Sequence, residues 1–141
     1  MEIKKITDVQ ITASTEYDAA HGTTNGRLNF KPGGGKTGAW SARQNDVHQW
    51  LQVDLEVKTE VSGIKIQGRQ DTDQWVTSFT ISYSSDGTIY TSYQNSKVWK
   101  PMKIVARETQ AINKSNLFRH RNMKMSQNLR PALASTSHLL V

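Results

Sequence analysis

Residues 69–75, RQDTDQW, gather two carboxylates, a guanidinium, two amides and an indole directly after an apolar run. Asp71 and Asp73 have the chemistry of a general acid and base. However, residues two apart in an extended loop point the same way, whereas glycoside hydrolysis needs carboxylates that face each other. Calcium needs more alternating oxygen ligands than these, so we keep it as a weaker alternative. Carboxylates, guanidinium and an aromatic ring together favour sugar binding.

Other catalytic chemistry has little support in the chain. Residues 33–38, GGGKTG, resemble a phosphate-binding loop, but Phe30 stands where that motif needs its first glycine. The absence of cysteine excludes disulfides and thiolate zinc sites. His21 and His48 are the histidines of the first 99 residues, and neither has a Ser and Asp close by in sequence. We therefore expect a binding protein rather than an enzyme.

Charged and aromatic residues are unevenly distributed along the chain. Residues 1–99 hold 10 Lys and Arg against 11 Asp and Glu, whereas residues 100–141 hold 8 against 1. Ten of the eleven aromatic residues also lie in residues 1–99. We therefore predict one folded domain in residues 1–99 and a basic, atypical, poorly ordered tail in residues 100–141. No apolar run is long enough to cross a bilayer, and the first residues lack a signal-peptide core.

Apolar residues in the first 99 positions recur with a period of two, which is typical of strands with one buried face. Leu51, Val53 and Leu55 form one such face. Turn signals occur at 30–38 and 84–87, and the latter contains the Asp-Gly pair of a hairpin. The predicted strands are residues 6–14, 50–55, 62–68 and 75–83, with a further strand at 103–107 and a short basic helix at 116–125. The pattern indicates an antiparallel sandwich or barrel.

Several long blocks resemble the discoidin domain, also called the coagulation factor V/VIII type C domain. The blocks are QITASTEY at 10–17, GRLN at 26–29, GAWSARQNDVHQWLQVDL at 38–55 and GIKIQGRQDTDQWVTSFTISYSSDG at 63–87. With the region of Trp99 they cover about residues 7–99. The resemblance implies an all-β, galactose-binding-domain-like jelly-roll β-sandwich with ligand loops at one end. It also implies non-enzymatic binding in cell adhesion or extracellular recognition.

The resemblance places the ligand among three loops, residues 16–25, 30–38 and 69–74. Their tips are mainly polar, which favours a galactose-type cell-surface glycan or glycoprotein, as in a lectin, over an anionic phospholipid membrane. The expected ligand-binding residues are the pocket walls Tyr17 and His21, the acceptors Asn45 and Asp46, the polar partners Arg69, Asp71 and Asp73, and the framework ring Trp75.

The tail departs from the family pattern. Only residues 104–107, IVAR, echo the segment that usually closes the sandwich, and the two cysteines of the family are absent. The resemblance therefore implies that two or more C-terminal strands are missing, which leaves exposed edges and a marginally stable domain. A truncated product without binding of its own is one alternative. Contact of the basic tail with nucleic acid or anionic membrane is another, although no nucleic acid is expected as a partner.

Overall fold

The computed structural model describes residues 6–94, 97–98, 109–127 and 136–140. Within these residues the chain forms strands and short 3₁₀ helices, which confirms the all-β prediction. No helix in this described part is both long and apolar enough to span a membrane. In chain order the elements are η1 (Asp8–Gln10), β1 (Ile11–Ala13), η2 (Ala19–His21), η3 (Thr23–Gly26), β2 (Trp40–Ser41), β3 (Trp50–Gln67), β4 (Phe79–Ser84), β5 (Thr91–Ser92), β6 (Thr109–Gln127) and β7 (Thr136–Leu140).

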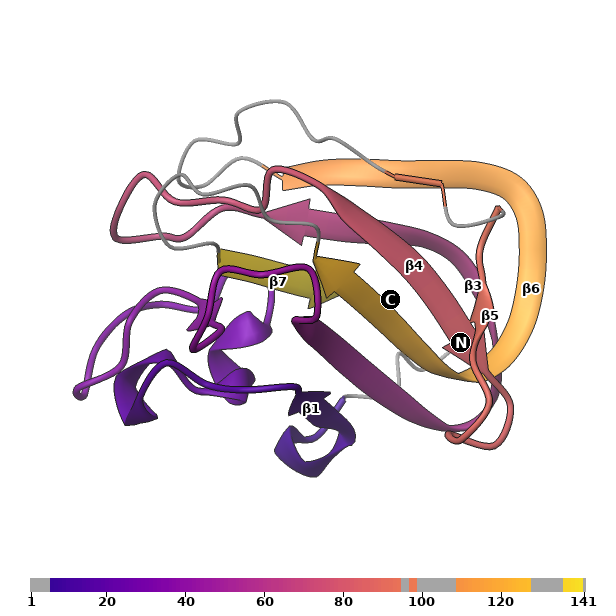
Figure 1. Cartoon of the computed structure of the whole chain (residues 1–141), viewed down its shortest axis with the longest axis horizontal. Helices are drawn as coiled ribbons and strands as arrows, with labels where there is room; N and C mark the ends of the chain where they lie inside the picture. Colours follow the sequence, from indigo (N-terminus) through magenta and orange to yellow (C-terminus); the bar gives the residue numbers. More distant parts are fainter. Residues whose placement is uncertain (1–5, 95–96, 99–108, 128–135, 141) are drawn as a thin grey trace.

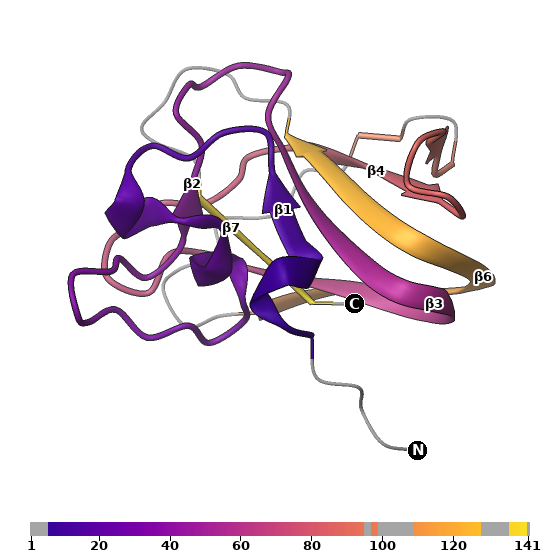
Figure 2. The same ribbon diagram turned by 90° about the horizontal axis from the view of Figure 1, so that it is seen from below.

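The two longest strands, β3 and β6, bend side by side and so take part in both layers of the sandwich (Figures 1 and 2). The first half of β3 pairs with β1 and with the end of β6, which pairs in turn with β4. The second half of β3 pairs with the start of β6 and with β7, and β7 pairs with β2. The β3–β6 register shifts between Asp54 and Thr59, and Glu56 has a φ of 61°. Such an irregularity bends a strand, and here it folds one sheet into two layers.

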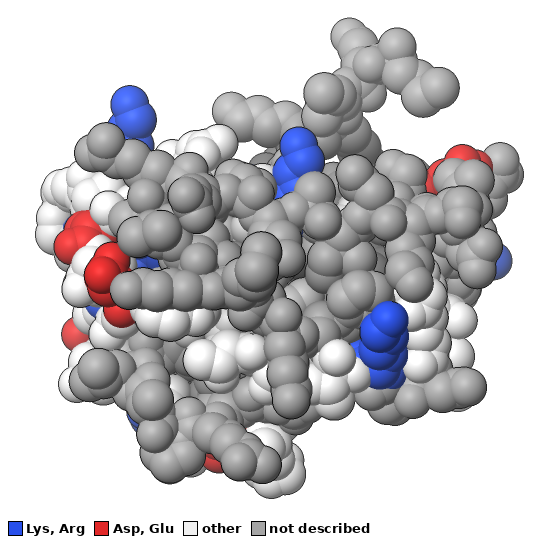
Figure 3. Space-filling view, turned by 90° about the horizontal axis from the view of Figure 1, so that it is seen from above, with Lys and Arg blue, Asp and Glu red and all other residues white. Residues whose placement is uncertain are grey.

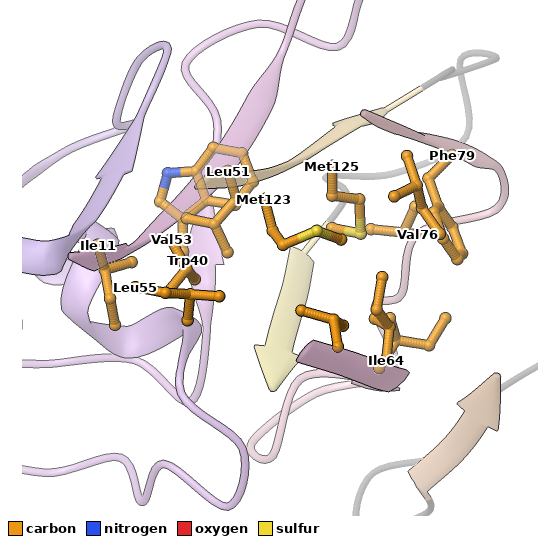
Figure 4. Packing of buried hydrophobic residues seen from close by; sticks show 13 residues of the cluster. Ile11, Trp40, Leu51, Val53, Leu55, Ile64, Val76, Phe79, Met123 and Met125 are labelled. Atoms are coloured by element: carbon orange, nitrogen blue, oxygen red, sulfur yellow. The ribbon is translucent and has the colours of Figure 1, made fainter. Parts of the chain in front are cut away.

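The core lies between the layers and is filled by alternate residues of the strands (Figure 4). Leu51, Val53 and Leu55 are buried together, as the period of two predicts. Trp40 is fully buried and its indole N–H donates to the carbonyl of Thr15 at 3.0 Å, so its polar atom is satisfied. The remaining members of the cluster are Ile11, Val61, Ile64, Ile66, Val76, Phe79, Ile81, Met123 and Met125.

The end of β6 lies between β3 and β4, where the resemblance left no strand. Met125 pairs with Leu51 of β3 and with Ile81 of β4, and its side chain is 1% exposed. The helix predicted at 116–125 is therefore wrong, because Met123 and Met125 follow a strand period and turn inward. The prediction that two or more C-terminal strands are missing is therefore wrong, because β6 and β7 are part of the sheet.

The other predictions for residues 100–141 are not tested by β6 and β7. The strand predicted at 103–107 lies outside the described residues. The domain division at residue 99 and the poor order expected for residues 100–141 stay predictions.

The strand predicted at 75–83 is shorter in the structure, since β4 begins at Phe79. Val76 is buried although the alternation placed it on the other face, because the chain before β4 is not extended as a strand. Trp75 packs partly against the core. The predicted turn at 84–87 is confirmed: it joins β4 to β5, and Gly87 takes a φ of 80° that favours glycine.

Candidate functional site

Three connections gather at one end of the sandwich, the left end in Figures 1 and 2. We call residues 16–25 the first loop, residues 30–38 the second loop and residues 69–74 the third loop. The first contains η2 and η3, and the third follows β3 directly. The hairpin at 84–91 lies at the opposite end. The three loops therefore share one end, as the resemblance implies.

Hydrogen bonds to backbone carbonyls tie these loops to one another. The N–H of Thr37 donates to the carbonyl of Ala20 at 2.9 Å, which joins the second loop to the first. The N–H of Gln70 donates to the carbonyl of Gly38 at 3.4 Å, which joins the third to the second. The fully buried Asn25 donates from Nδ2 to the carbonyls of Ala20 and Thr37, at 2.8 and 3.1 Å. These hydrogen bonds connect the three loops to one another without a ligand.

The side chain of Arg69 joins the third loop to the first, and its partner Asp71 joins the third loop to the second. Its Nε and Nη2 atoms donate to Oδ1 and Oδ2 of Asp71, at 2.6 and 3.0 Å. Its Nη1 donates to Oε1 of Gln74 at 2.9 Å and lies 3.3 Å from Nε2 of His21. Oδ1 of Asp71 also accepts the backbone N–H of Gly38 at 3.0 Å. Because the side chain of Arg69 is only 13% exposed, these charged contacts are partly shielded from water.

His21 carries the same network into the first loop. Asp18 caps η2 and accepts the backbone N–H of His21 at 3.0 Å, and Nδ1 of His21 lies 2.6 Å from the same carboxylate oxygen. The ring of Tyr17 meets the ring of His21 edge to face, with 5.2 Å between the centroids. The side chain of His21 is 15% exposed, whereas Tyr17 is 60% exposed. Tyr17 thus presents an aromatic ring to solvent beside a fixed polar network.

Some hydrogen-bonding capacity at this end is unused within the described residues. A guanidinium has five N–H donors, and the contacts of Arg69 occupy four, which leaves one on Nη2. Oδ2 of Asp71 accepts one bond, from Arg69, and can accept another. The hydroxyl of Tyr17 belongs to an exposed side chain. A donor and an acceptor beside an aromatic ring can bind neighbouring hydroxyls and the apolar face of one sugar.

The two carboxylates of the network have depressed pKa values. The hydrogen bond from Arg69 lowers the pKa of Asp71, and the hydrogen bond from His21 lowers the pKa of Asp18. A depressed pKa in the folded state contributes stability above the unfolded pKa, and this stability is lost as the pH falls through the folded value. Both carboxylates therefore stay charged at neutral pH and down to about pH 5.

The structure places Asp46 in a separate turn, just before β3. Its Oδ1 accepts the backbone N–H of His48 and Nε2 of Gln49, both at 2.8 Å. Oε1 of Gln49 in turn accepts the hydroxyls of Ser14 and Thr15, at 2.9 and 2.6 Å. These bonds fix the turn against the strand that precedes the first loop.

The other expected ligand residues differ in how far they are exposed. Asn45 and Asp73 are exposed, and Trp75 is half-buried against the core. The structure therefore brings together Tyr17, His21, Arg69 and Asp71. The ligand roles of all eight residues stay predictions.

Asp18, Gln74 and Gly38 complete the network, and they lie in the three predicted loops but were not among the expected ligand-binding residues. Asp18 had a usable signal, because an Asp three residues before the end of a short helical turn is a typical N-cap. Gln74 and Gly38 contact Arg69 and Asp71 only through tertiary packing.

We predict that Gly38→Ala separates the second and third loops. A Cβ at Gly38 would lie 2.7 Å from Oδ1 of Asp71 and 2.9 Å from the backbone nitrogen of Gln70, which is too close. We expect a loss of about 1–3 kcal/mol in the free energy of unfolding, as for other overpacked sites, measured by urea titration. The matched control is Gly22→Ala in the first loop, where a Cβ would make ordinary contacts at 3.6 Å. Equal unfolding midpoints for the two variants would contradict the packing described.

Charged side chains are unevenly placed on the face shown in Figure 3. Acidic side chains gather at the left end, where the three loops lie in Figure 1, and the visible basic side chains stand apart from one another. Among the described residues no group of three or more His, Asp or Glu side chains could hold a metal ion. A calcium role for Asp71 and Asp73 stays an untested alternative.

A model of the F5/8 type C domain family matches residues 10–123 of the chain. The chain belongs to this family. The match runs past residue 99 into β6, the strand that completes the centre of the sheet. F5/8 type C domains are carbohydrate- or phospholipid-binding modules in related proteins. The jelly-roll sandwich expected from the resemblance is thus confirmed.

Relatives of this F5/8 type C domain are longer proteins. EGF-like repeat and discoidin I-like domain-containing protein 3 of Homo sapiens is 41% identical over 105 residues, which are 69% of this chain and 21% of that protein. Discoidin II of Dictyostelium discoideum superposes with a TM-score of 0.81 and 27% identity, over 92% of this chain and 52% of the other. The family 32 CBM from C. perfringens NanJ in complex with galactose superposes with a TM-score of 0.67 and 15% identity, over 92% and 89%.

Proposed function

We propose that this F5/8 type C domain is a non-enzymatic binding module whose ligand is a galactose-type glycan of a cell-surface glycoprotein. The observation that carries the proposal is the network of Arg69, Asp71 and His21 beside the exposed ring of Tyr17. Its groups are fixed by the fold, so a ligand need not order them on binding, and this reduces the entropic cost of association. The module would act outside the cell, in adhesion or recognition.

The chemistry of the network suits a sugar with adjacent hydroxyls. The remaining N–H donor of Arg69 can bind one hydroxyl oxygen, and Oδ2 of Asp71 can accept the hydroxyl proton of its neighbour. Tyr17 can pack its ring against the C–H face of the same sugar. Because the carboxylate of Asp71 is held by Arg69 and Gly38, its position is set before binding.

An anionic phospholipid membrane is the competing ligand that the resemblance implies. Insertion into a membrane needs bulky apolar side chains at the loop tips. Among the large exposed hydrophobic residues of the described chain, only Tyr17 lies in the three loops. The second loop instead exposes Lys31, Lys36 and three glycines with positive φ. This composition supports a glycan over membrane insertion, and the test below includes a lipid arm.

The proposal is supported by the shared fold, because a solved structure with this fold contains galactose. The family 32 CBM from C. perfringens NanJ holds galactose on the same fold, although its sequence is only 15% identical. Discoidin II, at 27% identity, shares the fold over 92% of this chain. Neither similarity assigns a ligand to this chain, which spans only part of its relatives.

We predict that the chain is retained on immobilised galactose and that Tyr17→Ala weakens this retention about tenfold, because the stacking ring is lost. Tyr17→Phe is the matched control, since it keeps the ring and should retain most of the binding. Retention should be unchanged by EDTA, and binding to phosphatidylserine vesicles should be weak. Strong vesicle binding without galactose binding would favour the lipid ligand, and EDTA-sensitive retention would favour calcium.

A further inference from the structure

His21 lies between an anion and a cation of the loop network, and this position fixes which of its nitrogens carries the proton. Arg69 can only donate, so Nε2 of His21, at 3.3 Å from Nη1, must accept. The ionised carboxylate of Asp18 can only accept, so Nδ1, at 2.6 Å, must donate. Both contacts are satisfied at once only by the neutral ring with its proton on Nδ1.

We propose that His21 is a positioning residue for Arg69, and that protonation of its ring uncouples the first loop from the third and weakens ligand binding. The inference rests on the proposed function of this end of the domain. In the neutral form the ring links Asp18 to Arg69, so the guanidinium is held from the first loop as well as by Asp71 and Gln74.

Protonation acts differently on the two sides of the ring. The bond from Nδ1 to Asp18 survives, because the imidazolium still donates there. Nε2 loses its lone pair, and its new N–H meets the guanidinium of Arg69 as a second donor and a second positive charge. Arg69 must then move away from His21 or turn, and the donor that faces the ligand moves with it.

The ionisable groups near His21 are carboxylates, a guanidinium and a phenol. Among the described residues, Asp18, Asp71, Arg69 and Tyr17 are the charged and titratable side chains that contact His21 or Arg69, and the carboxylate of Glu16 lies in the same loop, where it accepts the N–H of Thr23. The hydrogen bond from His21 lowers the pKa of Asp18, and the hydrogen bond from Arg69 lowers the pKa of Asp71. Of the side-chain types in this cluster, the imidazole is the one whose ordinary pKa lies between pH 5 and pH 8.

The test compares galactose affinity at about pH 7.5 and about pH 5.5 for the whole chain, the range over which histidine changes charge. For the native sequence we expect a loss of about tenfold at the lower pH. His21→Gln keeps an acceptor for Arg69 but cannot titrate, so whatever affinity it has at the higher pH should be almost the same at the lower pH. His48→Gln is the matched control and should lose affinity at low pH as the native chain does.

A result in which His21→Gln keeps the full pH dependence, or in which His21→Leu binds as well as the native chain at both pH values, would overturn the inference. A second measurement does not depend on the ligand. The ¹⁵N spectrum of the imidazole should show the proton on Nδ1 at neutral pH, and the guanidinium signals of Arg69 should shift as His21 titrates. If galactose is not bound at all, the proposed function fails, whereas a proton on Nε2 or unmoved Arg69 signals would remove the inference itself.

Discussion

Arg69→Ala is expected to lower the affinity for immobilised galactose by about tenfold to a hundredfold, which corresponds to about 1.4–2.8 kcal/mol. The substitution removes the side chain that contacts Asp71, Gln74 and His21. The substitution removes the N–H groups that these three side chains accept, and a lost hydrogen bond costs more free energy where the groups are shielded from water. Isothermal titration with galactose or lactose measures the change, and urea unfolding shows whether the domain remains folded.

Two further variants sharpen this test of Arg69. Arg69→Lys keeps the positive charge but cannot reproduce the planar fork that binds both oxygens of Asp71, so most of the affinity should still be lost. Arg27→Ala is the matched control, because Arg27 pairs with the exposed Asp8 and contacts Ile6, away from the Arg69 network. Binding that survives Arg69→Ala but not Arg27→Ala would place the ligand elsewhere on the domain.

Met125→Ala is expected to lower the free energy of unfolding by about 2–5 kcal/mol, as for other buried methionines replaced by alanine. The side chain is 1% exposed and lies between Leu51 of β3 and Ile81 of β4. Its loss leaves a cavity at the centre of the sandwich. Urea or thermal unfolding followed by circular dichroism measures the effect.

The matched control for the methionine is Met125→Leu, a swap of similar volume that should cost less than about 1.5 kcal/mol. Because β6 pairs with both β3 and β4, removal of residues 100–141 should abolish cooperative unfolding altogether. A Met125→Ala variant that unfolds with the native midpoint would instead support the expectation that residues 1–99 are the folded domain and the tail is dispensable.

The first half of β3 could be predicted because its apolar residues alternate in sequence. Leu51, Val53 and Leu55 show the period of two without interruption, and they are buried together. The end of β6 has the same period in Met123 and Met125, but basic and amide residues surround it, and the positive charge of the tail indicated a solvated segment. Pairing with β3 and β4 outweighs that composition, because a strand between two others gains bonds along both edges.

The candidate site shows the same division between local and tertiary information. The sequence by itself determined that the third loop is polar and which family the chain resembles. It also determined that Tyr17, His21, Arg69 and Asp71 are candidate ligand residues. Only the tertiary structure decided that Asp71 is fixed by Arg69 and Gly38, and that His21 links Arg69 to Asp18. Residues 18 and 21, residue 38 and residue 69 belong to three loops that are far apart in the chain, and the fold places these loops side by side. Side-chain types can be read from local patterns, whereas their partners depend on which distant segments the fold places side by side.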